Sequence, residues 1–222
     1  MKQTPPTNIH NQTILDCIKN KKYSKVVEVG CMYGALAAKY IENNREVNWI
    51  GLDIDSDYVE EAKKQCTTAF CADIEKLSDL EFKHLADANL WIFADVLEHL
   101  YNPWSLLQKI RESSSELEII ACIPNSQHWS FQARINSGDI NYENHGLFDK
   151  THIRFFSQTT MSQLFKNAGY NIINIIPRIF NFPGQDKYDE CIYNFAKLSG
   201  IDPVLAVQRS KVFQYVYHVE RS

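Results

Sequence analysis

The 222-residue sequence lacks a long apolar stretch, a strong excess of charge and an apolar leader. Its longest apolar run, residues 90–97, is interrupted by Asp95 and is far shorter than the ~18 residues that cross a membrane. Lys and Arg number 23 against 27 Asp and Glu, and with this net charge of −4 we do not expect general nucleic-acid binding. Because no apolar core follows Met1, we expect a cytoplasmic protein without a membrane span.

The six cysteines lack the spacings that would indicate a special role. They occupy positions 17, 31, 66, 71, 122 and 191, and none forms a Cys-x-x-Cys pair or a zinc-type motif. Without a secretory signal, such residues are typically reduced thiols that pack as small apolar groups. The spacing therefore predicts no disulfide framework and no metal site.

The sequence does contain a regular alternation of short apolar segments with helical patterns, which is typical of α/β proteins. We predict one domain, residues 1–222, built on a doubly wound, mostly parallel seven-stranded sheet whose last strand is antiparallel and outermost. Strands are expected at residues 25–29, 46–53, 69–72, 89–94, 118–123, 170–176 and 212–219, and helices at 35–42, 56–65, from 103, at 157–168 and around 196.

Two segments lie outside this alternation. Residues 1–22 are expected to contain one short helix, at about 13–19. Residues 125–156 are rich in Asn, His, Gly and aromatic residues and have weak periodicity. Because an irregular segment of this length inside a domain is usually functional, we predict that it is a lid over a binding site.

A glycine-containing turn joins the first predicted strand to the next helix. Gly30 follows the strand directly, Gly34 opens the helix, and Glu28 precedes both. Such glycines let the backbone turn sharply and approach a ligand, and the helix N-terminus offers free N–H groups. Asp53 ends the second strand at nearly the ~20-residue separation expected for a carboxylate that binds a ribose diol. These features indicate a cofactor that contains a nucleoside.

Two cofactor classes use this arrangement. A dinucleotide requires Gly-x-Gly-x-x-Gly, whereas Met32 occupies the middle position here. Glu28 has no role in binding phosphates, but its carboxylate could fix the loop or reach an ammonium group. The turn therefore favours an amino-acid tail over a pyrophosphate, and an NAD-dependent oxidoreductase is the disfavoured alternative.

At this point the chain resembles the class I S-adenosylmethionine-dependent methyltransferases. Residues 28–34 and 51–54 are similar to the first two motifs of that family, and residues 71–74 and 93–103 to the third and fourth. The resemblance implies S-adenosylmethionine as cofactor and gives each matching position a role. Beside Glu28, the implied cofactor-binding residues are Gly30 and Gly34 at the methionine tail, Asp53 at the ribose, Ile54, Asp73 and Ile74 at the adenine, and Asp95 near the sulfonium.

The second half of the chain is similar to a bacterial branch of these enzymes. The matching segments are residues 123–125, 128–129 and 146–157. The branch includes methyltransferases of surface-polysaccharide sugars and relatives of quinone-biosynthesis O-methyltransferases. It implies O-methylation of a sugar hydroxyl in a surface-glycan or nucleotide-sugar pathway. The alternatives are O- or N-methylation of a quinone or phenol, and a partner subunit that binds the cofactor without catalysis.

A hydroxyl acceptor must lose a proton near the transition state, and histidine has an unperturbed pKa of ~6.5 that suits this step. Our hypothesis is that His152 is the base, oriented by Asp149, with His128 as its competitor. Arg154 is free to hold an anionic part of the acceptor. The other candidate acceptor-binding residues are His99, Asn125 and His145. The expected partner is a small molecule or a glycan, whose identity the sequence leaves open, as it does the choice between monomer and homodimer.

Overall fold

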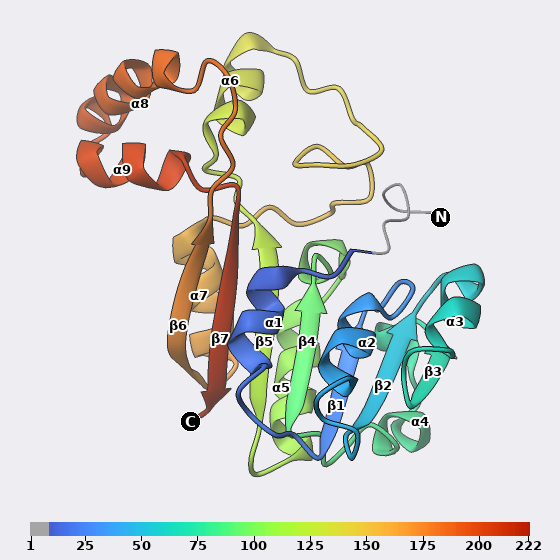
Figure 1. Ribbon diagram of the computed structural model, residues 1–222. Helices are drawn as coiled ribbons and strands as arrows, with labels where there is room; N and C mark the ends of the chain where they lie inside the picture. The colour runs from blue at the N-terminus through green and yellow to red at the C-terminus, as the bar shows by residue number, and fades with distance from the viewer. Residues whose placement is uncertain (1–8) are drawn as a thin grey trace.

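The computed structural model describes residues 9–222, and these form a seven-stranded sheet with helices on both faces (Figure 1). The strand order is β3-β2-β1-β4-β5-β7-β6. Residues 1–8, the start of the predicted N-terminal segment, lie outside the described residues. The strands are β1 (Lys25–Val29), β2 (Asn48–Asp53), β3 (Thr68–Cys71), β4 (Leu90–Ala94), β5 (Glu118–Pro124), β6 (Tyr170–Arg178) and β7 (Gln214–Arg221).

Pairing within the sheet confirms the predicted doubly wound fold. Neighbours among β1 to β5 run parallel, and β7 runs antiparallel to both β5 and β6. The prediction that the last strand is outermost is wrong, since β7 is inserted between β5 and β6 and leaves β6 at the edge. Residues Gln214 to Val219 of β7 are buried, as expected for a strand with a neighbour on each side.

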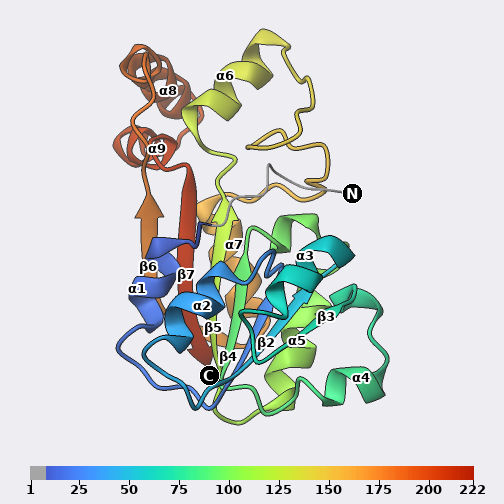
Figure 2. The same ribbon diagram turned by 45° about the vertical axis from the view of Figure 1, so that its right-hand side comes forward.

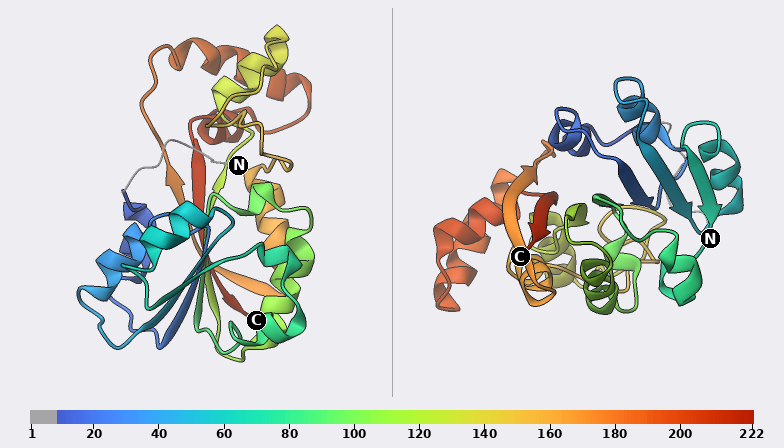
Figure 3. Two further views of the ribbon diagram at one scale, coloured as in Figure 1. Left: turned by 90° about the vertical axis from the view of Figure 1, so that its right-hand side faces the viewer. Right: turned by 90° about the horizontal axis from the view of Figure 1, so that it is seen from below.

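Two helical layers cover the sheet because successive strand residues point to opposite faces. Val26 belongs to the core formed with α1, α2 and α3, whereas Val27 belongs to the core formed with α4, α5 and α7 (Figure 3). The helices are α1 (Gln12–Ile18), α2 (Ala35–Ile41), α3 (Ser56–Ala62), α4 (Asp79–Lys83), α5 (Pro103–Ser113) and α7 (Gln158–Asn167). No helix in this described part of the chain has the length and apolar character that a membrane crossing requires.

A cap lies above the carboxyl ends of the parallel strands and consists of residues 125–156 and 179–213 (Figure 2). The first segment contains α6 (Trp129–Ser137), a helix that the sequence analysis did not predict because it buries none of its residues and carries no apolar stripe. The second segment contains α8 (Asp186–Leu198) and α9 (Pro203–Ser210). Stacking of Trp129 on Tyr188, with ring centroids 4.9 Å apart, joins the two segments.

Asn125 attaches the cap to the sheet. Its side chain is fully buried, and its amide nitrogen donates to the carbonyl oxygens of Arg209 at 3.0 Å and Val212 at 2.7 Å. Its amide oxygen accepts from the Gln127 N–H at 3.1 Å. These bonds occupy the side chain, and the acceptor-binding role of Asn125 stays a prediction. Its role in the structure is to connect the end of β5 with the chain that enters β7.

Replacing Asn125 by Ala is expected to lower the free energy of unfolding by about 2 kcal/mol, because buried backbone groups lose their partners. Asn136→Ala is the matched control, since the amide of this exposed residue donates only to Gln132 O and its loss should cost less than ~0.5 kcal/mol. Urea denaturation of both variants measures the difference. Equal losses would show that Asn125 does not anchor the cap.

Candidate functional site

The turn between β1 and α2 has an unusual backbone. Gly30, Met32 and Gly34 all have positive φ angles, of 72°, 46° and 73°. Met32 occupies the position where the motif often has glycine, and it adopts the left-handed conformation despite its side chain. Its N–H donates to Asp53 Oδ2 at 2.9 Å, and this charge-assisted bond helps to hold the strained residue. Met32 thus has the left-handed backbone that favours glycine, although it carries a side chain.

Gly30 also allows the turn to pack closely against the residue that follows β4. A Cβ atom at Gly30 would lie 2.6 Å from Val96 Cγ2, well inside van der Waals contact. The turn therefore meets the segment that follows β4 at the carboxyl edge of the sheet, where open α/β folds bind their ligands.

Asp53 lies at the end of β2 and supports the turn. Besides the Met32 N–H, its carboxylate accepts the Asp55 N–H at 3.0 Å. Burial raises the pKa of this carboxyl group, while the backbone hydrogen bonds act in the opposite direction. The ribose-binding role of Asp53 stays a prediction, and its contacts show that it also fixes the turn.

The three residues predicted at the adenine lie on neighbouring segments. Ile54, directly after β2, is 67% exposed, so its side chain is available to an incoming ring. Asp73 caps a short 3₁₀ helix, η1 (Ile74–Lys76), by accepting the Glu75 N–H at 3.1 Å, and it pairs with Lys76 at 2.8 Å. Ile74 is buried, and its predicted contact with the adenine stays a prediction.

Glu28 is buried beneath the turn. Its carboxyl group accepts a hydrogen bond from Trp49 Nε1 at 3.0 Å. Burial raises the pKa of Glu28 to about 8, against the effect of the Trp49 bond, so the group is largely protonated at neutral pH. A contact with the ammonium group of a ligand stays a prediction for this residue.

Asp95 occupies a strained position directly after β4, with φ of 56°. Its carboxyl group accepts from the Gln214 amide nitrogen, and Arg178 donates to the Gln214 amide oxygen. Burial raises the pKa of Asp95 to about 6, while the positive charge of Arg178 opposes this shift. Gln214 and Arg178 support Asp95 from two distant strands, and sequence reasoning did not find them because strand order decides their proximity.

Glu98, in the short 3₁₀ helix η2 (Leu97–His99), is buried with two histidines around it. It is 1% exposed. Its Oε1 lies 3.8 Å from His152 Nε2 and 4.0 Å from His99 Nε2. Neither carboxylate oxygen of Glu98 has a hydrogen-bond partner among residues 9–222. Burial and the nearby charge of Asp95 raise the pKa of Glu98 well above its usual range.

Backbone bonds hold this cluster together. The Glu98 carbonyl accepts the N–H groups of Ile153 and Arg154, each at 3.0 Å, which fixes the end of the cap segment beside η2. The Asp149 carboxylate accepts from the Thr151 N–H at 2.8 Å and from the Thr151 hydroxyl at 2.6 Å, and it interacts electrostatically with His152. The Glu98 carboxylate lies 3.8 Å from His152 Nε2, and the orienting role of Asp149 stays a prediction.

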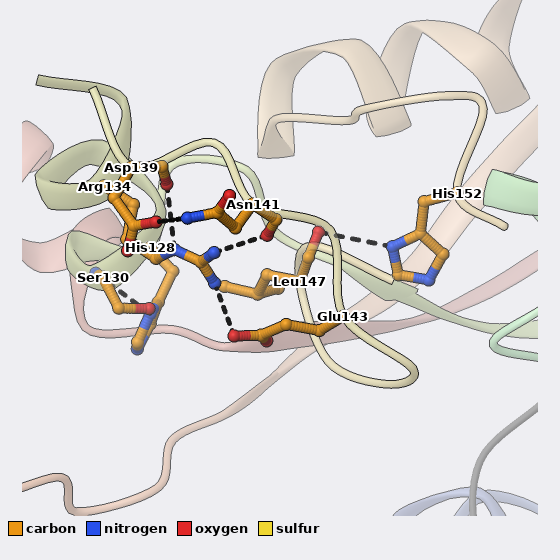
Figure 4. Close-up of polar contacts among 8 residues, drawn as sticks. All are labelled: His128, Ser130, Arg134, Asp139, Asn141, Glu143, Leu147 and His152. Atoms are coloured by element: carbon orange, nitrogen blue, oxygen red, sulfur yellow. Dashed lines mark hydrogen bonds and ion pairs between the residues drawn. The ribbon is translucent and has the colours of Figure 1, made fainter. Parts of the chain in front are cut away.

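His128 lies away from this cluster (Figure 4). It is fully buried and caps α6, since its Nδ1 accepts the Ser130 N–H at 3.3 Å and also lies 2.8 Å from the Ser130 hydroxyl. Its ring packs against those of Phe182 and Phe213. These contacts give His128 a structural role in the cap, and its role as a competing base stays a prediction.

The remaining predicted acceptor residues differ in position. His145 is exposed on the cap. Arg154 donates to the Tyr101 carbonyl at 2.6 Å and lies over the ring of Trp104, so it borders the cluster from outside.

Arg134 organises the irregular part of the cap, and the sequence analysis missed it. Its guanidinium donates to Glu143 at 2.9 Å and to the carbonyls of Asp139 and Asn141 (Figure 4). It also lies over the ring of Phe148, with 4.1 Å to the centroid. Nothing in its local spacing distinguishes it from an ordinary surface arginine.

The comparisons with known proteins agree with this geometry. A family described as "Methyltransferase domain" matches residues 10–175, and the chain belongs to that family. No curated protein matches the chain in sequence. The class of the protein is therefore an S-adenosylmethionine-dependent methyltransferase.

Solved structures show the same fold. A magnesium protoporphyrin IX methyltransferase from Synechocystis PCC 6803 is 12% identical, with a TM-score of 0.58, over 95% of this chain and 78% of that chain. A plantazolicin methyltransferase is 15% identical, with a TM-score of 0.58, over 95% of this chain and 80% of that one. A methyltransferase from Archaeoglobus fulgidus is 14% identical, with a TM-score of 0.59, over 95% and 90% of the two chains.

Replacing Gly30 by Ala is expected to lower the free energy of unfolding by more than the ~1–2 kcal/mol that a left-handed residue costs, because the new Cβ also meets Val96. Gly138→Ala is the control. It has a similar φ of 76° with nothing within 4 Å of its Cβ position, so it measures the conformational cost alone. Urea denaturation gives both values, and equal losses would show that the turn does not press on Val96.

The stability of the cap should depend on pH through His128. Burial lowers the pKa of this histidine to about 4, so between pH ~6.5 and 4 the unfolded state binds more protons than the folded state. The free energy of unfolding therefore falls as the pH drops through this range, by up to about 3 kcal/mol from His128. His128→Asn keeps a capping side chain but cannot titrate, so its unfolding curves should show a smaller decrease. An identical pH dependence would contradict this assignment.

Proposed function

We propose that the protein transfers the methyl group of S-adenosylmethionine to a hydroxyl of a sugar, in a surface-glycan or nucleotide-sugar pathway. The observation that carries this proposal is the position of the Glu98–His99–His152 cluster. Glu98, the first residue of the cluster, lies two residues after Val96, which contacts Gly30. Side chains that can accept or donate a proton therefore lie next to the turn that we expect to hold the cofactor.

The residues present fit the cofactor. Gly30 and Gly34 give the turn its left-handed backbone, Asp53 lies at the end of β2, and Ile54 exposes its side chain beside it. When bound, S-adenosylmethionine supplies an electrophilic methyl group. Gly30 and Gly34 would hold its methionine part, Asp53 its ribose hydroxyls, and Ile54 its adenine ring.

On the acceptor side, the protein must orient the hydroxyl and take up its proton. Burial and the neighbouring His99 lower the pKa of His152 to about 4, so its ring is neutral at pH 7 and Nε2 can accept a proton. Arg154 borders this position and would pair with a phosphate or carboxylate of the acceptor. The cap would exclude water from the pocket.

The free cysteines support a cytoplasmic location.

A second candidate is methylation of a phenol or quinone hydroxyl. Its support is Phe155, which is 49% exposed, close in sequence to His152, and packed on Phe131 with 5.3 Å between ring centroids. An aromatic acceptor could stack on such a ring. A sugar acceptor would instead depend on Arg154 and on the polar residues of the cap.

Calorimetry with S-adenosylhomocysteine and a panel of sugar and phenol acceptors tests the proposal. The wild-type protein should release or absorb heat with the product and turn over one acceptor class. His152→Ala should reduce kcat by ~10²–10⁴-fold while binding S-adenosylhomocysteine within a few-fold of wild type. His84→Ala is the control, since it changes an exposed histidine at the C-terminal end of α4.

Folded protein that gives no heat with the cofactor or its product would overturn the proposal. Normal turnover by His152→Ala would remove this residue from catalysis while leaving the cofactor assignment intact. Turnover of phenols alone would favour the second candidate.

A further inference from the structure

The buried carboxylate of Glu98 needs an explanation. Burying a charged or polar group without a partner is costly, yet both of its oxygens lack a hydrogen-bond donor among residues 9–222. Two imidazole nitrogens lie close by, and one ligand atom each from Glu98, His99 and His152 fall within 4.8 Å of one another. The Glu98 carboxylate and the two imidazole nitrogens can all donate a lone pair, so together they suit a cation bound between them.

The backbone sets the orientation of both histidines. His99 Nδ1 lies 3.0 Å from the Thr151 carbonyl, and His152 Nδ1 lies 3.4 Å from the Leu147 carbonyl. A carbonyl accepts, so each Nδ1 carries the proton and each Nε2 presents a lone pair. Both Nε2 atoms are directed at Glu98 Oε1, at 4.0 Å and 3.8 Å. Metal-binding histidines are typically held in this way, with the second nitrogen donating to a carbonyl or carboxylate.

We propose that Glu98, His99 and His152 bind a divalent transition-metal ion, such as Zn²⁺ or Mn²⁺. Two imidazole nitrogens and one carboxylate suit these ions, whereas Ca²⁺ and Mg²⁺ favour ligand sets made of oxygen. Ligand bonds of ~2.0–2.1 Å in a tetrahedron place ligand atoms ~3.3 Å apart. The histidine nitrogens therefore need to approach Glu98 Oε1 by about 0.5–0.7 Å, from 3.8 Å and 4.0 Å. All three ligand atoms already lie within 4.8 Å of one another, so rotations of the side chains would bring them to the ion.

Three protein ligands leave at least one coordination position for a substrate, as in catalytic rather than structural metal sites. His152 belongs to the cap segment and Glu98 to the sheet edge, so the ion would also join these two parts of the molecule. The sequence gives no sign of this set, because His152 is far from Glu98 and His99 along the chain and follows no zinc-type spacing.

The role of the ion rests on the proposed function. The acceptor hydroxyl would bind at the open position, and the positive charge would lower the pKa of that hydroxyl, whose proton passes to solvent. The oxygen then forms a bond to the methyl carbon as the carbon–sulfur bond breaks, and the electron pair of that bond neutralises the sulfonium. With the ion bound, His152 would be a metal ligand and no longer the base. The ion would then activate the acceptor hydroxyl in its place.

Metal binding is tested without any turnover assay. Tag-free, full-length protein is stripped with a chelator and titrated with Zn²⁺, Mn²⁺ and Co²⁺ by calorimetry, and the visible spectrum of the Co²⁺ form reports its coordination. Wild type should bind one ion. Glu98→Gln and His152→Ala should each lose at least tenfold in affinity. His84→Ala changes a histidine outside the cluster and should bind as wild type does.

Binding of S-adenosylhomocysteine, measured on the same samples, separates the two proposals and shows that each variant is folded. Heat with the cofactor product but none with any of the three metals overturns the metal site and leaves His152 as the base. Metal affinity that is unchanged in Glu98→Gln and His152→Ala overturns it as well. Metal binding without cofactor binding would keep the ion site and remove the proposed function.

Discussion

The contact between Gly30 and Val96 is the constraint on which the rest of the site depends. Parallel pairing of β1 and β4 aligns their carboxyl ends, and the absence of a Cβ at Gly30 makes room for the Val96 side chain between the two following segments. The turn that follows β1 and the short helix that follows β4 are therefore neighbours. One carries the groups expected to hold the cofactor, and the other carries Glu98 and His99. The absence of a side chain at position 30 thus lets the turn expected to hold the cofactor lie beside Glu98 and His99.

The cap completes the site through separate attachments. Asn125 ties its first segment to the chain entering β7, the Glu98 carbonyl holds its far end, and Trp129 stacks on its second segment. Inside the cap, Arg134 bonds three neighbouring loop positions and covers the buried ring of Phe148. The cap consequently depends on a few buried polar groups, whereas the sheet depends on two extensive apolar cores.

Local patterns predicted the fold well and the site in part. The strands and the glycine turn were predictable because short apolar runs and glycines at fixed offsets act over a few residues. Helix α6 was not, since it buries no side chain, and the place of β7 was not, since strand order depends on contacts between distant segments. The same limit hid the partners of Asp95 and the approach of His152 to Glu98. Asn125 and His128, predicted at the site as polar residues near a lid, also have structural roles, which depend on burial and on contacts that no local pattern indicates.

The insertion of β7 between β5 and β6 also constrains how the sheet is completed during synthesis. β6 pairs only with β7, and β5 keeps an open edge on that side until residues 214–221 have left the ribosome. Five parallel strands can assemble beforehand, but they present the exposed backbone of β5 to other chains in the meantime. The final strand therefore acts as a closing element, and the nascent protein is most prone to aggregate immediately before it emerges.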